Sequence, residues 1–183
     1  MANSDDVTSS REILKIGDIA YKRANSEAVM SRFAATNNFI SKLQTDIKEF
    51  KMNGSYSVAT GITYFDGIAS FFYNSEIVGV TFWNGQSGTS GTTEFDLRWQ
   101  NATGTDQGSI FSVTPKINST SSDETFAQRN LETGNDNGKT TGVTLPTFSK
   151  TQFLEGEAVY AVLNSSMVSA QNCGITIFYR PIN

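Results

Sequence analysis

Apolar residues recur every three or four positions between residues 29 and 50, and this periodicity ends at Asn53-Gly54. The alternating spacing of four and three is the heptad pattern of helices that pack against partner helices. Its bulky, β-branched and aromatic positions favour three helices over two. We therefore predict an oligomerising stem helix over residues 26–54. Its seam comprises Val29, Phe33, Thr36, Ile40, Leu43, Ile47 and Phe50.

A second interpretation of this segment is an amphipathic helix that lies on the protein's own β domain. The pattern covers only about three heptads, the lower limit for a coiled coil. Met30 and Phe39 also widen the apolar stripe toward the face of an ordinary globular helix. Asn25 or Ser26 could cap either helix, and Gly54 could end it.

Residues 55–183 show short segments of alternating apolar and polar residues, separated by turns rich in Gly, Asn, Ser and Thr. Such alternation predicts strands with one inward face, and the short intervals between turns are typical of two stacked antiparallel sheets. The fold expected is mainly β, a jelly-roll-like antiparallel β-sandwich that forms a head domain over 55–183. The predicted strands are 55–60, 62–73, 76–83, 93–99, 109–113, 143–148, 158–163 and 175–180.

Three sets of strand residues are expected to share inward faces. They are Val78, Val80 and Phe82, then Phe95, Leu97 and Trp99, and finally Ile175, Ile177 and Tyr179. The polar stretches 118–124 and 133–141 are expected to be exposed loops. Residues 1–25 keep neither helical nor strand periodicity, and we predict that they form a docking arm.

Charge is distributed unevenly along the 183 residues, whose net charge is −4. Residues 55–183 carry only 6 of the 14 Lys/Arg but 11 of the 18 Asp/Glu, and this acidic balance disfavours binding to nucleic acid. The first residues have no secretory signal pattern, and no run of eighteen apolar residues occurs, so we expect synthesis in a cytosol and no membrane span. A single cysteine excludes an intrachain disulfide.

The chain has no histidine, so the commonest general base and metal ligand are missing. Glu94 and Asp96 lie two apart on a predicted strand and could form a glycosidase-like acid pair. Because their neighbours are expected to point inward, we predict instead a solvated outer face or ion pairs with Arg98 and lysine side chains. Glu155 and Glu157 have the same spacing and are predicted to be solvated turn charges.

Other motifs of known chemistry are incomplete. Gly85, Gly88 and Gly91 lack the lysine and following helix of a phosphate loop, so a flexible hairpin is expected. Residues 135–138 resemble a calcium loop, but Thr144 occupies the position that requires a bidentate glutamate. We therefore predict no catalytic residue, no cofactor and no metal site.

Cys173 precedes the last predicted strand, and we expect it to be a half-buried turn residue. Four asparagines fit the glycosylation pattern, although glycosylation is not expected without a signal peptide. They are Asn53, Asn101, Asn118 and Asn164. Three aromatic residues, Tyr64, Tyr73 and Trp83, could stack on sugar rings, but for each one burial in the core is the more common outcome.

A series of short motifs follows in a fixed order between residues 60 and 181. They are Ser75-Glu76-Ile77-Val78-Gly79-Val80, Gly88-Thr89-Ser90-Gly91-Thr92-Thr93 with Glu94-Phe95-Asp96-Leu97, Ile110-Phe111-Ser112 with Pro115-Lys116-Ile117, Gly142-Val143-Thr144-Leu145-Pro146, Phe153-Leu154-Glu155-Gly156-Glu157, and Ile175-Thr176-Ile177-Phe178-Tyr179-Arg180-Pro181. Together they resemble the small β-sandwich of tailed-phage virion proteins, which stands on head fibres, tail fibres and capsid decoration proteins, commonly as trimers. The stretch 126–141 departs from this resemblance, because it is longer and more polar than in that family.

The resemblance implies a structural virion protein without enzymatic activity, a trimeric head fibre or capsid decoration protein assembled in the bacterial cytoplasm. The expected partners are two further copies of the chain and other virion proteins of the capsid, neck or tail, bound through the arm at 1–25. The alternative is a tail-fibre or receptor-binding protein that binds host-surface carbohydrate. A carbohydrate-active enzyme is a third, weaker candidate.

Overall fold

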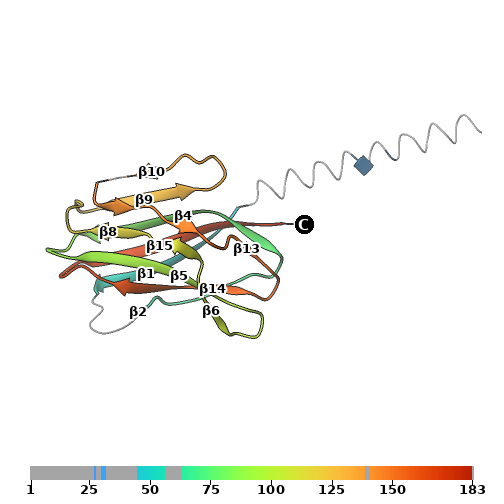
Figure 1. The fold of residues 1–183 in the computed structure, drawn as a ribbon, viewed down its shortest axis with the longest axis horizontal. Coiled ribbons are helices and arrows are strands. Elements are labelled where there is room, and N and C mark those ends of the chain that lie inside the picture. The colour runs from blue at the N-terminus through green and yellow to red at the C-terminus, as the bar shows by residue number, and fades with distance from the viewer. Residues whose placement is uncertain (1–26, 28–29, 32–44, 57–62, 139–140, 183) are drawn as a thin grey trace, which may run out of the picture. The chain divides into compact units, whose positions relative to one another are not determined.

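The computed structural model describes residues 27, 30–31, 45–56, 63–138 and 141–182 (Figure 1). The chain divides into two compact units, Met1–Leu43 and Gln44–Asn183. In the first unit Glu27, Met30 and Ser31 are helical and exposed. Among the described residues, no helix has the length and apolar character needed to cross a membrane.

The second unit is built from antiparallel strands in two main sheets (Figure 1). The first sheet, called sheet A, has the order β1-β15-β4-β9-β10, and β13 also pairs with β4. The bounds of its strands are β1 Asp46–Ser55, β4 Ser75–Gln86, β9 Thr125–Asn130, β10 Asn137–Gly138, β13 Gln152–Phe153 and β15 Gln171–Pro181.

The second sheet, called sheet B, has the order β11-β8-β5-β14-β2, with β6 added on β5 and β3 on β14. A separate two-stranded sheet is formed by β7 (Phe111–Val113) and β12 (Thr147–Phe148). The bounds in sheet B are β2 Thr63–Tyr64, β3 Ala69–Ser70, β5 Thr92–Gln100, β6 Asp106–Ser109, β8 Lys116–Asn118, β11 Val143–Thr144 and β14 Ala158–Ser165.

Side chains from both sheets form one buried hydrophobic cluster. Phe82 of β4 lies against Phe95 of β5, with 5.8 Å between the ring centroids, and this contact joins the two sheets. Ile175 and Leu163 are also buried completely in the cluster. The prediction of a mainly β, antiparallel fold is therefore confirmed, and we call residues 44–183 the sandwich. The jelly-roll description of its connectivity stays a prediction.

The predicted helix over 26–54 is wrong from Asp46 onward, because Asp46–Ser55 forms strand β1. Here the apolar residues also fit a period of two. Phe50 is fully buried in the core, whereas Ile47, predicted to lie on the same seam, is 63% exposed. Ladder hydrogen bonds with β15, in a register from Asp46 opposite Tyr179 onward, stabilise the extended conformation over the helical one.

The rest of the stem prediction lies outside the described residues. This applies to Val29, Phe33, Thr36, Ile40 and Leu43, and to the docking arm at 1–25. The second compact unit begins at Gln44, so the predicted domain boundary at residue 55 lies too late in the chain.

Four predicted strands, 76–83, 93–99, 158–163 and 175–180, are confirmed as parts of β4, β5, β14 and β15. The predicted strands 109–113 and 143–148 are each divided between two short strands. Of the predicted strand 62–73, only the two-residue strands β2 and β3 form. Of the predicted strand 55–60, Ser55 ends β1, and 57–60 lie outside the described residues.

The polar stretch 126–141 contributes more to the fold than its composition indicates. It holds most of β9, which pairs with β4 along Gly79–Asn84, and Ala127 is part of the core. Residues 133–138 are exposed, as predicted for this loop. In the other predicted loop, 118–124, Ser121 is buried.

A β-bulge in β4 changes one of the predicted inward faces. Gly79 pairs with Phe178 but Ile77 pairs with Tyr179, so Val78 is an extra residue in the ladder. As a result Ile77 and Val80 both enter the core cluster, and Val78 does not.

Candidate functional site

The outer face of sheet B carries the two carboxylates singled out from the sequence, Glu94 and Asp96 on β5. The structure contradicts a solvated face for Asp96, which is only 3% exposed. It lies opposite Val162 of β14, which is also buried. The polar partners of the two carboxylates come from β6, from the segment that follows β7 and from β8.

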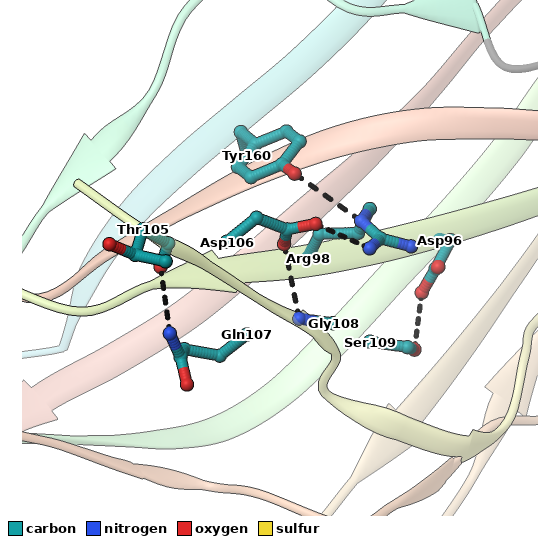
Figure 2. Close-up of polar contacts among 8 residues, drawn as sticks. All are labelled: Asp96, Arg98, Thr105, Asp106, Gln107, Gly108, Ser109 and Tyr160. Carbon is teal, nitrogen blue, oxygen red and sulfur yellow. Dashed lines mark hydrogen bonds and ion pairs between the residues drawn. The ribbon is translucent and has the colours of Figure 1, made fainter.

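Asp96 accepts a short hydrogen bond from Ser109, whose hydroxyl oxygen lies 2.5 Å from Oδ1 (Figure 2). The same hydroxyl accepts a hydrogen bond from the backbone N–H of Phe111 at 3.0 Å. Burial raises the pKa of Asp96, and the hydrogen bond from Ser109 and the charge of Arg98 offset this only in part.

The pKa of Glu94 shifts in the opposite direction to that of Asp96, although both carboxylates lie on the same face of the sheet. Thr114 donates to Oε1 at 2.6 Å, and the Lys116 ammonium lies 2.9 Å from Oε2. Burial alone would raise the pKa of Glu94, but these hydrogen bonds outweigh it, and the pKa lies below its ordinary value. The Asn164 side chain of β14 also acts to lower the pKa of both Glu94 and Asp96.

Arg98 continues this polar row. Its Nη2 donates to Asp106 at 2.5 Å and its Nε donates to the Tyr160 hydroxyl at 3.3 Å (Figure 2). The hydrogen bond from Arg98 lowers the pKa of Asp106, and the same contact raises the pKa of Arg98. The ring of Tyr160 is stacked on that of Tyr64, with centroids 6.0 Å apart. The predicted pairing with lysine is confirmed for Glu94, which pairs with Lys116, whereas Arg98 forms its ion pair with Asp106 of β6.

Two carboxylates with opposite pKa shifts are the arrangement that acid–base catalysis uses. Here each carboxylate binds hydroxyl or ammonium donors from the protein itself. These contacts hold β6 and the segment at Thr114 onto β5. Within the described residues, no three His, Cys, Asp or Glu side chains gather as metal ligands.

The two residues of the other acidic pair, Glu155 and Glu157, lie in different environments. Glu155 is exposed, as predicted. Glu157 is buried, and its Oε2 accepts from the backbone N–H of Leu154 at 2.9 Å and lies 3.1 Å from Nζ of Lys150. The prediction of solvated turn charges is therefore wrong for Glu157.

The glycine-rich turn after β4 packs closely against Met167 and Val168. A β-carbon on Gly88 would collide with the backbone oxygen of Val168 and the side chain of Met167. In the calcium-like loop, Arg129 binds Asp136 at 2.6 Å, and Asn137 pairs with Gln128 in the ladder.

Cys173 is a fully buried strand residue rather than a half-buried turn residue. Burial raises its pKa to about 12. Two of the glycosylation-like motifs form turns: Asn101 Oδ1 accepts from the N–H groups of Thr103 and Thr105, and Asn118 Oδ1 accepts from that of Thr120.

Of the three aromatic residues proposed for sugar stacking, Tyr64 and Tyr73 are 63% and 69% exposed. Trp83 is half-buried, and its ring lies over Gly174 of β15. Sequence reasoning did not identify the polar partners Ser109, Thr114, Tyr160 and Asn164. Pairing of β5 with β14 and β6 brings Tyr160, Asn164 and Ser109 to this face, and the sequence alone does not determine that pairing.

Comparison with known proteins gives no family. No family model matches the chain, and no curated protein matches it. Among solved structures, a chain of the cyanophage Pam1 capsid asymmetric unit is 11% identical with a TM-score of 0.31, over 76% of this chain and 86% of that one.

Two other solved structures match over the same share of this chain. A CocE/NonD family hydrolase from Staphylococcus aureus is 10% identical with a TM-score of 0.29, over 31% of its own chain. A mutant VP2 protein of infectious bursal disease virus is 10% identical with a TM-score of 0.23, over 40% of its chain. At these scores the similarities carry no argument about function.

Proposed function

We propose that the protein is a structural component of a tailed-phage virion, a head fibre or capsid decoration protein that displays the sandwich on the particle. The observation that carries this proposal is the division of the chain into a compact sandwich, Gln44–Asn183, and a separate unit, Met1–Leu43. The first unit, Met1–Leu43, contains the heptad positions from Val29 to Leu43, so it can supply both the stem and the attachment arm.

The resemblance to phage virion sandwiches supports the same proposal. The residues that carry it most clearly, Glu76–Val80, Glu94–Leu97 and Ile175–Arg180, lie in three long strands of the two sheets. The proposal is non-enzymatic, because the candidate acidic residues Glu94, Asp96 and Glu157 are engaged in contacts that hold the fold together.

The stem is now restricted to residues before Thr45, and we propose that it joins three copies. Light scattering on the full chain should give about three times the mass of one chain. An Ile40→Asp variant, with a charge in the seam, should dissociate, because burying an unpaired carboxylate is costly. A wild-type monomer at micromolar concentration would refute the stem.

The virion role is tested by imaging purified particles of the phage that encodes the chain. We expect sandwich-sized density on the head, and loss of that density when residues 1–25 are deleted from an otherwise folded chain. Normal incorporation of the chain that lacks residues 1–25 would contradict the proposed role of the arm. Density on the tail instead of the head would favour the alternative of a tail-fibre protein.

A carbohydrate-binding role is the second candidate, and it is favoured by the exposed Tyr64 ring stacked on Tyr160. A flat aromatic surface beside the Arg98–Asp106 pair offers stacking together with hydrogen bonding. A sugar-array screen of the wild type and of Tyr64→Ala tests it. Binding that is lost in the variant would favour this role, and hydrolysis of a sugar would overturn the structural proposal.

A further inference from the structure

The outer face of sheet A differs in chemistry from that of sheet B. Residues directly opposite in antiparallel strands share a face, so the pairing register defines this surface. Its central row comprises Thr176, Thr81 and Gln128, one residue each from β15, β4 and β9. All three are uncharged, whereas sheet B presents the ionic network of Glu94 and Arg98.

The rows on either side of this centre are aromatic and glycine-containing. On one side Phe178 lies against Gly79, and on the other Trp83 lies against Gly174 with Phe126 beside it. Phe126 is 47% exposed. Interface cores are depleted in charge and enriched in aromatic residues, and this surface has that composition.

Charged residues occur at the borders of this surface. At one end Arg180 pairs with both Glu76 and Glu132. On the edge strand β1, Glu49 pairs with Lys51 at 3.1 Å. An uncharged centre with a polar rim is the usual anatomy of a protein–protein interface.

A groove of about 130 Å³ connects this surface with the point where the chain enters the sandwich. Its lining includes Thr45, Gly79, Asn130 and Phe178. Leu43, the last heptad position before β1, precedes Thr45 by two residues, so their α-carbons can be at most about 8 Å apart. Packed helices have axes only about 8–10 Å apart. A stem that joins copies at Leu43 would therefore bring their Thr45 residues, and the surface beside them, close together.

We propose that this outer face of β15, β4 and β9 packs against a second copy of the same chain, so that the sandwiches associate as well as the stems. The inference rests on the proposed stem. It adds that the sandwich surface near Thr45 is an interface rather than a displayed face.

The test is thiol labelling of the full chain at single introduced cysteines. Thr81→Cys and Gln128→Cys place a thiol in the centre of the face, and Gln107→Cys places one on the exposed β6 strand of the other sheet as a control. Native Cys173 is fully buried and contributes little to the labelling of a folded chain. Each variant is also made with Ile40→Asp, which breaks the stem.

We expect Thr81→Cys and Gln128→Cys to react at least about tenfold more slowly than Gln107→Cys in the assembled chain, because opening the contact must precede reaction. Ile40→Asp should remove this protection without changing the control. Protection that persists in a monomeric Ile40→Asp chain would overturn the proposal, because the cover would then come from the same chain.

A trimer in which both sites react as fast as the control would overturn the inference and leave the stem and the virion role intact. A wild-type chain that is monomeric and reactive at both sites would overturn the stem as well. As a second readout, Phe126→Asp should weaken assembly of a folded chain, whereas Gln107→Asp should not. Equal assembly of the two would count against the proposed face.

Discussion

Trp83 and Gly174 lie opposite each other on β4 and β15, and the indole fills the space above the glycine. A β-carbon at residue 174 would lie 2.8 Å from Cε2 and Nε1 of Trp83 and 2.9 Å from the backbone oxygen of Phe50. The strands β1, β15 and β4 therefore approach one another with no room for a side chain at this position.

Gly174→Ala should destabilise the sandwich for this reason. We expect the free energy of unfolding to fall by about 1–3 kcal/mol, because the backbone oxygen of Phe50 cannot move without disturbing β1. Urea denaturation followed by fluorescence measures the change. Gly85→Ala is the matched control, since its nearest neighbour is the side chain of Asn172 at 3.1 Å. An equal cost at both sites would show that the close approach is not the cause.

Glu94 and Asp96 should give opposite dependences of stability on pH. The pKa of Asp96 is raised on folding, so its ionisation costs stability as the pH rises from about 4 through the pKa of the folded state. The pKa of Glu94 is lowered, so its contribution is present above about pH 4.3 and is lost as the pH falls through the folded pKa.

Asp96→Asn should therefore gain stability relative to the wild type as the pH rises, and Glu94→Gln should lose it. The measurement is the free energy of unfolding of each variant between about pH 3 and pH 7. Parallel curves for the two variants would contradict the assignment of burial as the dominant effect at Asp96 and of hydrogen bonding at Glu94.

Lys150 should stabilise the sandwich through Glu157. Its Nζ lies 3.1 Å from the buried carboxylate and 4.0 Å from the centroid of the Trp99 ring. Lys150→Met removes the cation and leaves the charge buried. Since Lys150 is itself partly exposed, we expect a loss of about 1–3 kcal/mol rather than the full cost of a buried pair.

A double variant, Lys150→Met with Glu157→Gln, should recover part of this loss because no unpaired charge remains. Lys51→Met is the control, because Lys51 and Glu49 are both exposed and such a pair is worth less than about 1 kcal/mol. Unfolding by urea compares the four chains. No recovery in the double variant would mean that Lys150 acts through its contacts with the Trp99 and Phe153 rings and not through Glu157.

Cys173 should be unreactive in the folded protein. The thiol is fully buried, and its pKa of about 12 leaves almost no thiolate at neutral pH. Maleimide labelling should be slow in buffer and fast in urea. Rapid labelling of the folded chain would show that the end of the sandwich near Tyr56 opens readily.

The long strands could be predicted from the sequence because their alternation is local. Phe95 and Leu97, like Ile175 and Ile177, are inward residues of strands long enough to show the period of two. Strands β2 and β3 have two residues each and could not be recognised in this way. β9 was missed because Gln128, Arg129 and Asn130 do not have the composition of a strand, and its conformation depends on pairing with β4.

The misplaced end of the helix has a related cause. The spacing between Ile47 and Phe50 fits a helix, yet the same segment also alternates between Phe50 inward and Glu49 and Lys51 outward. Pairing with β15 decides between these two periods, and no local signal reports it. The candidate acidic residues were found from the sequence, but their environments depend on Ser109, Thr114 and Asn164, which come from other strands and turns.

Both ends of the sandwich leave it on the same side. Asp46 pairs with Tyr179, and the N–H of Ile182 donates to the backbone oxygen of Asn74 at 2.7 Å. The opposite side consists of turns that bind one another, as where Thr89 donates to Val168 and Ser119 donates to Gly91. A peptide fused after Ile182 would therefore start beside the point where the chain enters at Thr45, whereas an insertion into these closed turns would start on the far side.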